Sequence, residues 1–483
     1  MGNPNEKGLG TLRLTMFGIG LILASGAFAI PGDFAAAGAY PLASLIGWGV
    51  AGIGMFCLCM SFFRLSIAKP ELTSGLYTYA KDGFGDFIGF CSAWGYWISA
   101  ILAQISFITM LFSSLGHFFP DVFGTSGNTG VSIISASVIV WVLALLISRG
   151  INQAVTINVI VVAAKLLPIL VLLVAIIFAG AFDWDVFTAN FTGEGSGMSL
   201  MEQVKGTTFI TVWIFIGIEG SVVISERAKN TKVAGRATVI CFLCMLALYM
   251  MISVLSMGVM PTEELAALDT PSVAGVLQAV VGGWGATLVN VAVIISVAGA
   301  LFTYTILCID SAYAPASKGC FPKFFAKVNK RGTPVTAVIL STAVIQIFLI
   351  IIYFNEATYQ ICYALSTSMI MFPYLLSGLY CLKVTIKGDT LEGVSSGAAR
   401  AGIWIFAIIG AVYGAWMLYA SGWQSVLASA VLFGPGILLY LYTQRQKEIK
   451  LFPKTTDAVA AAVVLVAFVA AIILMAKGTI NLF

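Results

Sequence analysis

Long apolar runs, separated by short polar joints, recur along this sequence from residue 11 to residue 476. A helix needs about 20 such residues to cross a bilayer. Because 60% of the residues are hydrophobic and only 10% are charged, the chain is not an ordinary soluble globule. The runs also lack the in-out alternation of barrel strands. The pattern therefore predicts an all-α polytopic membrane protein.

The apolar runs predict thirteen membrane spans. The largest joints, residues 181–203 and 309–333, are too short to form a soluble domain, so a single membrane domain accounts for residues 1–483. The predicted spans are 11–33, 38–62, 86–116, 131–149, 153–180, 204–225, 236–260, 276–308, 334–354, 358–381, 402–420, 424–443 and 457–476.

Cations gather on alternate joints of this map. With a cytoplasmic N-terminus, the cytoplasmic joints hold all of the 25 lysines and arginines except Lys165, Lys205 and Lys477. This asymmetry obeys the positive-inside rule, so we expect a multi-pass protein of the inner (plasma) membrane. The net charge of +4 then reflects orientation, and no nucleic-acid surface is expected.

The nine cysteines and the single histidine predict no metal site and no cofactor. Cys241 and Cys244 form a C-x-x-C inside an apolar span without a second pair, so we interpret them as packing residues. His117 lies at the outer end of the third span, where no histidine-based metal site or proton relay can be built.

Two spans are interrupted by small residues near their middle. The first, "FGIGLILASGAFAIPG", contains Ala24, Ser25 and Gly26, and the sixth, "TVWIFIGIEGSVVISERAKN", contains Gly217 and Gly220. Either interruption alone also fits close helix packing. Two interrupted helices five spans apart favour an inverted repeat, in which spans 1–5 correspond to spans 6–10 and the broken pair meets at the bilayer midplane.

Broken helices expose backbone groups that bind ions. Free N–H groups suit an anion, and free carbonyls suit a cation. Together they suit a zwitterion, so we expect an amino acid with its carboxylate at Ser25 and Gly26. Its ammonium would lie against the carbonyls of Trp213 and Ile216.

Two charges lie deep in the predicted spans, and both are candidate functional groups. Glu219 is predicted to lie near a cationic substrate side chain or to act as a proton-titrating switch; alternatively it pairs with Lys165 or with the backbone. The Lys165 ammonium is predicted to stand where a sodium ion sits in cation-coupled relatives; alternatively it ties the fifth span to the first. Both alternatives for Lys165 place its amine facing the first span.

Aromatic and polar side chains complete the candidate pocket. Trp213 and Tyr304 can cover an ammonium or stack on a guanidinium. Gln104 and Ser368, with the neighbouring Ser366 and Thr367, are polar groups in apolar runs, and each is either a pocket member or an interhelical hydrogen bond.

The motifs "ASGAFAIP", "VWIFIGIEGSVVISERAKN" and "ASKGCFPKFFAKVNKRGTPVTA" resemble the amino acid, polyamine and organocation transporter superfamily, and within it the basic amino acid/polyamine antiporters. The resemblance covers the first twelve spans. It implies a five-plus-five inverted-repeat core over residues 11–381 with discontinuous first and sixth helices. Residues 402–476 would add C-terminal helices, of which the thirteenth span lies outside the core fold and is assigned no transport role.

The resemblance also implies alternating access and one-for-one exchange of a cationic amino acid for its metabolic product, with arginine/ornithine as the first guess. A decarboxylated amine is the other kind of product. By motif, the resemblance implies that Ser25 and Gly26 bind the carboxylate and that Trp213, Ile216 and Gly217 line the amine site. It implies pH sensing by Glu219 and gating by Tyr304. Gln104 and Ser368 correspond to family site residues less closely.

The first span departs from the family pattern, because Ala24 replaces a glycine and Ala27 a bulkier aliphatic residue. Both belong to the candidate substrate site, so histidine/histamine, lysine/cadaverine and tyrosine/tyramine exchange stay open. So does proton-coupled symport.

A proton-translocating subunit of a larger complex is the competing class, although such a subunit should show more ionisable groups across its spans. A channel or receptor would not need paired breaks. The expected partners are small amino acids or amines and the bilayer, and a homodimer is compatible with this interpretation.

Overall fold

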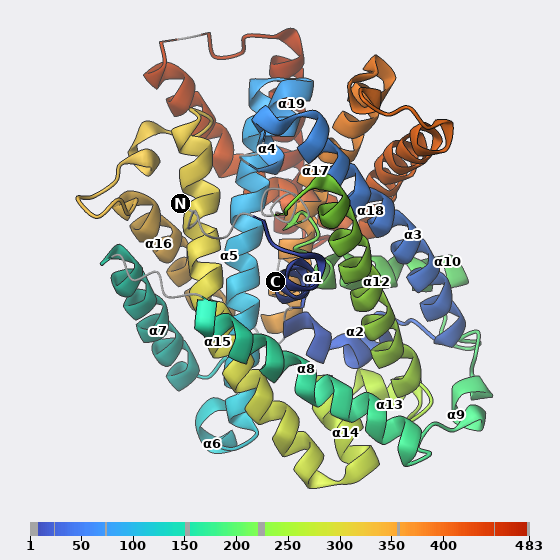
Figure 1. The fold of residues 1–483 in the computed structure, drawn as a ribbon. Helices are drawn as coiled ribbons and strands as arrows, with labels where there is room; N and C mark the ends of the chain where they lie inside the picture. Colours follow the sequence, from blue (N-terminus) through green and yellow to red (C-terminus); the bar gives the residue numbers. More distant parts are fainter. Residues whose placement is uncertain are drawn as a thin grey trace. The chain divides into compact units, whose positions relative to one another are not determined.

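The computed structural model describes residues 8–23, 25–72, 75–149, 155–220, 228–354, 358–448 and 450–480. Over these ranges the chain is helical and forms no strand, apart from an isolated bridge between Leu9 and Ala228 (Figure 1). The prediction of an all-α chain is confirmed.

Nine helices in the described ranges are long and apolar enough to cross a membrane, which confirms a polytopic protein. They are α3 (Pro41–Ala68), α5 (Asp86–Gly116), α7 (Gly130–Ser148), α12 (Thr231–Ser256), α15 (Gly283–Ser317), α16 (Val335–Ile352), α17 (Thr358–Lys387), α18 (Gly397–Gln446) and α19 (Thr455–Ala476).

Shorter elements complete the described chain. They are α1 (Thr11–Ile22), η2 (Ser25–Phe28), α2 (Ile30–Ala36), η3 (Pro70–Leu72), α4 (Leu76–Phe84), α6 (Pro120–Phe123), α8 (Val155–Phe178), α9 (Trp184–Ala189), α10 (Leu200–Ile214), α13 (Thr262–Ala266), α14 (Ser272–Val281), η4 (Lys323–Ala326) and η5 (Asp389–Leu391).

The predicted span 276–308 is wrong at its start. Its first residues belong to α14, and α15 begins only at Gly283. Gly282 separates the two helices with a φ of 87°, a left-handed conformation that glycine adopts without strain. The apolar residues continue across this turn, so hydropathy alone gave no sign of it. A similar residue, Gly422 with a φ of 75°, interrupts α18 between the predicted spans 402–420 and 424–443.

The described residues form two compact units. Unit 1 takes its residues from Met1–Phe63, Phe107–Ser132 and Ala154–Ala300. Unit 2 takes its residues from Arg64–Ser106, Ile133–Gln153 and Leu301–Phe483.

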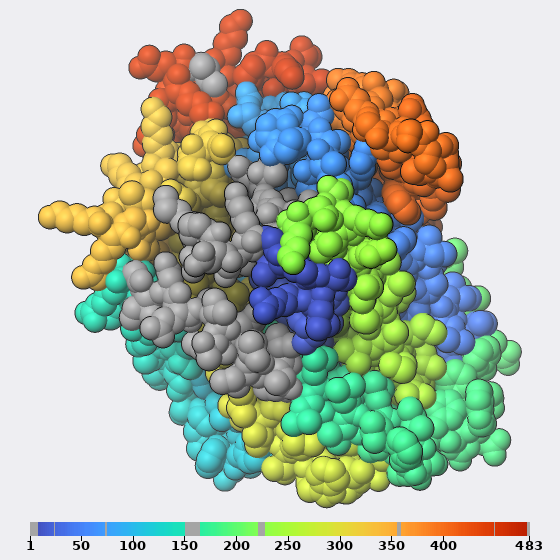
Figure 2. Space-filling view, viewed as in Figure 1, coloured from blue at the N-terminus to red at the C-terminus, as the bar shows by residue number. Residues whose placement is uncertain are grey.

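In unit 1, α1 lies beside α12 (Figure 1), and Leu14 and Ala237 are fully buried between them. Figure 2 shows the same neighbours at the surface, with the dark blue start of α1 against the light green start of α12. The short helix α2 packs against α10, α12, α13 and α14. Both halves of the first predicted span are therefore held by helices from the middle of the chain.

In unit 2, α17 packs against α4 and α18, and α18 packs against α19. The last helix is anchored by Asp457, a fully buried carboxylate whose Oδ1 accepts a 3.0 Å hydrogen bond from the backbone N–H of Phe87. Phe87 lies in the first turn of α5, where N–H groups lack partners within the helix. Asp457 therefore caps α5 from the far end of the sequence.

Candidate functional site

The first predicted span is broken, as the sequence indicated. Helix α1 ends at Ile22, the 3₁₀ turn η2 begins at Ser25, and α2 begins at Ile30. We call the segment between Leu23 and Ala29 the first break. The candidate residue Ala24 lies outside the described residues.

Two side chains from other helices hold the end of α1. The hydroxyl of Tyr249 donates a 3.1 Å hydrogen bond to the carbonyl of Ile22, and Lys165 Nζ donates a 2.7 Å hydrogen bond to the carbonyl of Leu23. Tyr249 is fully buried and Lys165 is 6% exposed. Carbonyls at a helix end need such partners because the helix supplies none. The prediction that the Lys165 amine faces the first span is confirmed.

Tyr249 was absent from the sequence candidates. Its ring also packs edge-on against Phe215, with 5.5 Å between the ring centroids, so it touches the region after α10 as well as the end of α1. The available signal was a phenol in the middle of the apolar run "MLALYMMIS", because a buried tyrosine hydroxyl requires a hydrogen-bond partner.

The sixth predicted span is also broken. Helix α10 ends at Ile214, and residues 215–219 form turns, which we call the second break. Gly217 has a φ of 109°, and a Cβ placed on it would lie 2.7 Å from the carbonyl oxygen of Leu21. The backbones of the second break and of α1 therefore touch, and only glycine fits at the contact. The two broken helices therefore meet here, whereas their relation by an inverted repeat and their place at the bilayer midplane stay predictions.

Glu219 lies within the second break. Its Oε2 accepts a 3.0 Å hydrogen bond from the N–H of Gly217, so one of the alternatives left open for this acid, a backbone hydrogen bond, is present. The side chain is partly buried. Its role as a pH-sensitive group stays a prediction.

The two residues predicted to hold a carboxylate lie against the end of α10. A Cβ on Gly26 would lie 2.6 Å from Nε1 of Trp213, so the backbone of the first break approaches the indole directly. Ser25 is 3% exposed, and its hydroxyl has no hydrogen-bond partner among the described residues. Ala27 and Ile216 are also buried. The structure thus brings Gly26 and Trp213 together, and their roles in substrate binding stay predictions.

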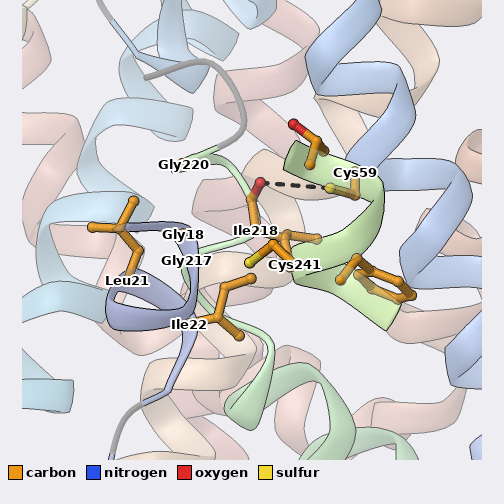
Figure 3. A pocket seen from close by; sticks show the side chains of 10 residues that line it. Gly18, Leu21, Ile22, Cys59, Gly217, Ile218, Gly220 and Cys241 are labelled. Carbon is orange, nitrogen blue, oxygen red and sulfur yellow. Dashed lines mark hydrogen bonds between the residues drawn. The ribbon is translucent and has the colours of Figure 1, made fainter. Parts of the chain in front are cut away.

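A small cavity is lined by α1, the second break, α12 and Cys59 of α3 (Figure 3). It holds about 10 Å³, which is room for about one water molecule and not for an amino acid. Figure 3 shows Ile22 of α1 and Cys241 of α12 beside Ile218 of the second break, whose carbonyl accepts a 3.9 Å hydrogen bond from the thiol of Cys59. Cys241 therefore packs in this wall, as predicted for an apolar span.

The remaining candidates, Gln104, Tyr304 and Ser368, belong to unit 2. Gln104 is fully buried, and its Nε2 donates a 2.8 Å hydrogen bond to Thr305 while its Oε1 accepts one from Cys308. Gln104 therefore links α5 to α15 at Thr305, the residue after Tyr304. This is the interhelical hydrogen bond predicted from the sequence as the alternative to a role in the pocket. The hydroxyl of Ser368 donates to the carbonyl of Ala364 in its own helix.

Comparison with known proteins adds to this geometry. A family model described as amino acid permease matches residues 9–435. The chain is 40% identical over 479 residues to an arginine/ornithine antiporter of Pseudomonas aeruginosa, covering 98% of both chains. It is 38% identical over 445 residues to a putative arginine/ornithine antiporter of Escherichia coli, covering 91% of this chain and 93% of the relative. It is 37% identical over 478 residues to an L-lysine transport protein of Corynebacterium glutamicum, covering 96% and 94%.

Proposed function

This chain belongs to the amino acid permease family, and on that premise we propose that it is a secondary antiporter that exchanges a cationic amino acid for its metabolic product. It is a multi-pass membrane transporter and not an enzyme. Arginine is the first substrate to test, with ornithine or a decarboxylated amine as the counter-substrate. The names of the relatives from Pseudomonas aeruginosa and Escherichia coli support arginine and ornithine as the exchanged pair. The name of the Corynebacterium glutamicum relative supports lysine as a second substrate to test.

The observation that carries the proposal is the contact between Gly217 of the second break and Leu21 of α1, two residues before the first break. Two helices interrupted side by side concentrate backbone groups that a zwitterion can satisfy. The substrate carboxylate would take the hydroxyl of Ser25 and the N–H of Gly26. An unpartnered buried hydroxyl costs free energy until a ligand pairs it.

The substrate amine would lie at Trp213, Ile216 and Gly217, with Glu219 sensing its charge. Lys165 would stand in for a coupling cation at the end of α1. The family resemblance supplies the rest of the proposal. It includes alternating access within an inverted-repeat core over residues 11–381 and a cytoplasmic N-terminus. It also includes roles in the substrate site for Ala24, Ala27, Tyr304, Gln104 and Ser368.

Counterflow in proteoliposomes tests the proposal. Vesicles are loaded with unlabelled arginine or with buffer alone, and uptake of labelled arginine, ornithine, lysine and histidine is compared. Uptake that requires internal substrate is the expected result, and internal competitors then identify the exchanged pair. Equal uptake into buffer-loaded vesicles under a proton gradient would contradict exchange and favour proton symport. Uptake of tyrosine or histidine alone would overturn the assignment of arginine.

A further inference from the structure

Asp33 is a buried carboxylate that the proposed exchange does not use. It lies in the first turn of α2 and is 5% exposed. Its Oδ2 is buried without a hydrogen-bond partner, and the ion pairs found among the described residues, Lys69 with Asp389 and Lys81 with Asp86, do not include it. Within the part of the chain that the structure describes, an ionised Asp33 would have no counter-ion, and its Oδ2 would have no donor.

The polar groups next to Asp33 along the chain are already hydrogen-bonded to Ser272 of α14. Ser272 accepts a 2.9 Å hydrogen bond from the N–H of Gly32 and donates a 3.1 Å hydrogen bond to the carbonyl of Ala29. On the following residue, Phe34 stacks on Trp48 of α3 with ring centroids 5.3 Å apart. These contacts hold α2 against its neighbours, and none of them involves the Asp33 carboxyl.

The elements that pack against α2 carry few groups of opposite charge. Its contacts are with η2, α10, α12, α13 and α14, and with α3 through the stacked rings. Neither η2 nor α14 contains a titratable residue. The titratable and charged residues on the others are Cys57, Cys59, Arg64, Glu202, Lys205, Lys232, Arg236, Cys241, Cys244, Tyr249, Glu263 and Glu264.

Several of these residues already have partners. Glu263 accepts a 2.7 Å hydrogen bond from the hydroxyl of Tyr40, Glu202 accepts one from Ser199, and Arg64 donates to the carbonyl of Thr390. The acids Glu263 and Glu264 lie on α13, which packs against α2, and they would disfavour a further negative charge there. No described side chain is observed to pair with the Oδ2 of Asp33, so its charge is left to be neutralised by a proton from water.

We propose that Asp33 is a proton site, protonated in the described arrangement and able to release its proton when α2 becomes hydrated. A proton needs only one oxygen, whereas a bound metal ion needs several oxygen ligands, and the described residues hold no cluster of three acidic, cysteine or histidine side chains. Burial of an ionised carboxylate without a partner is far less favourable than its protonation.

The position of Asp33 links this proton to transport. Helix α2 follows directly on η2, which contains Ser25 and Gly26, so movement of the first break and hydration of α2 are connected through one short segment. On hydration, the carboxylic acid gives a carboxylate and passes its proton to water. This inference rests on the proposed exchange function, which Asp33 would make dependent on pH.

Infrared difference spectroscopy on the full chain in vesicles tests the proton site without using transport. The wild type should show a carboxylic acid carbonyl band that disappears when the pH is raised, and Asp33→Asn should lack it. The control Asp185→Asn, which changes an exposed acid, should keep the band. A band that persists in Asp33→Asn, or its absence from the wild type, would overturn the proposal.

Counterflow of arginine at several pH values supplies the second readout. Asp33→Asn should still exchange arginine, but at a rate that no longer varies with pH as that of the wild type does. Loss of arginine binding in Asp33→Asn with recovery in Asp33→Glu would show instead that the carboxylate holds the substrate cation. If Asp33→Asn does not fold, a shifted acid band in Asp33→Glu supports the site and an unshifted band overturns it. A wild type with the band but without exchange would refute the proposed function and leave the proton site standing.

Discussion

Lys165 Nζ lies 2.7 Å from the carbonyl oxygen of Leu23, the residue that closes α1. One residue earlier, the carbonyl of Ile22 is bound by the hydroxyl of Tyr249. Two successive carbonyls at the first break are thus paired with side chains from α8 and α12. The first break is therefore stabilised by two side-chain hydrogen bonds, and each donor, Lys165 or Tyr249, can be removed by a single substitution.

Replacing Lys165 with Met should lower the melting temperature and the exchange rate. The change leaves the Leu23 carbonyl without its donor in a buried site, at a cost of about 1.5 to 3 kcal/mol. Thermal unfolding in detergent and counterflow measure the two effects. Lys165→Arg keeps a charged donor and should retain more of both. A Lys165→Met protein that melts and exchanges like the wild type would show that the bond is dispensable.

Measuring exchange with and without sodium distinguishes the two interpretations of Lys165. If the ammonium replaces a coupling cation, exchange by Lys165→Ala should recover when sodium is added to both sides of the vesicles. If Lys165 is only a tie between α8 and the first break, sodium should have no effect. The wild type, measured with and without sodium, is the control.

Replacing Gly26 with Leu should abolish arginine binding while the protein is still made and inserted. Even the first atom of a side chain at this position would lie 2.6 Å from Nε1 of Trp213, so Gly26→Ala should cost about 1 to 3 kcal/mol. Binding is measured by calorimetry on purified protein. Gly49→Ala is the matched control, because a Cβ there meets nothing within 4 Å. Retained binding in Gly26→Leu would refute the carboxylate site.

Replacing Gly217 with Ala should harm exchange more than replacing Gly282 with Ala. Both positions have positive φ, 109° and 87°, where alanine costs about 1 to 2 kcal/mol. Only at Gly217 does the added Cβ also meet backbone, 2.7 Å from the Leu21 carbonyl, whereas at Gly282 it meets nothing within 4 Å. Counterflow and melting temperatures of the two variants separate conformational strain from the contact. Equal losses would mean that the contact between the second break and the end of α1 is unimportant.

Replacing Tyr249 with Phe should destabilise the protein by about 1 to 3 kcal/mol, because the ring stays while the buried carbonyl of Ile22 loses its donor. We expect a lower melting temperature and a changed exchange rate with unaltered substrate preference. Tyr419→Phe, at a residue that is 61% exposed, should behave like the wild type. Tyr249→Phe with an unchanged melting temperature would assign the stability to the aromatic packing alone.

The ion pair between Lys69 and Asp389, 2.8 Å long, should stabilise the protein only within a pH window. Its hydrogen bond raises the pKa of Lys69 above 10.5 and lowers the pKa of Asp389 below 3.8. The contribution is therefore present near pH 7, and it is lost as the pH falls through the lowered pKa of Asp389 or rises through the raised pKa of Lys69. Because both side chains are partly exposed, it amounts to less than about 1 kcal/mol.

Asp389→Asn tests this pair. The variant should melt slightly below the wild type near pH 7, and the difference should vanish in acid and in strong alkali. A difference that persists after the carboxylate is protonated would mean that Asp389 stabilises the protein in some other way. Asp185→Asn, an exposed acid outside any observed ion pair, is the control.

The sequence predicted those features that depend on local composition. The span 86–116 has the same bounds as α5, because polar and small residues mark both of its ends. The breaks at Ser25–Gly26 and at Gly217 were likewise visible as small residues inside apolar runs. The turn at Gly282 was missed, because its neighbours remain apolar and glycine is common in membrane helices for other reasons.

The partners of the candidate residues could not be predicted, because they lie far apart in sequence. Nothing local distinguishes the Lys165 bond to Leu23 from a pairing with Glu219. Gln104 is bound to Thr305 and Cys308, 201 and 204 residues away. Asp33 drew no attention because it falls at the end of a predicted span, where an acid usually meets water. Its burial follows from the packing of α2 against α10, α12, α13 and α14.

The hydrogen bonds that hold the end of α1 have a consequence for affinity. Because Tyr249 and Lys165 already satisfy the carbonyls of Ile22 and Leu23, an arriving substrate does not have to unwind the helix. The proposed substrate site would therefore be preorganised, with the conformational entropy of this segment lost during folding rather than at each binding event. Two amino acids that compete for the site would then differ in affinity only through their own contacts. A preorganised site of this kind would suit the proposed exchange, in which two related molecules bind in turn.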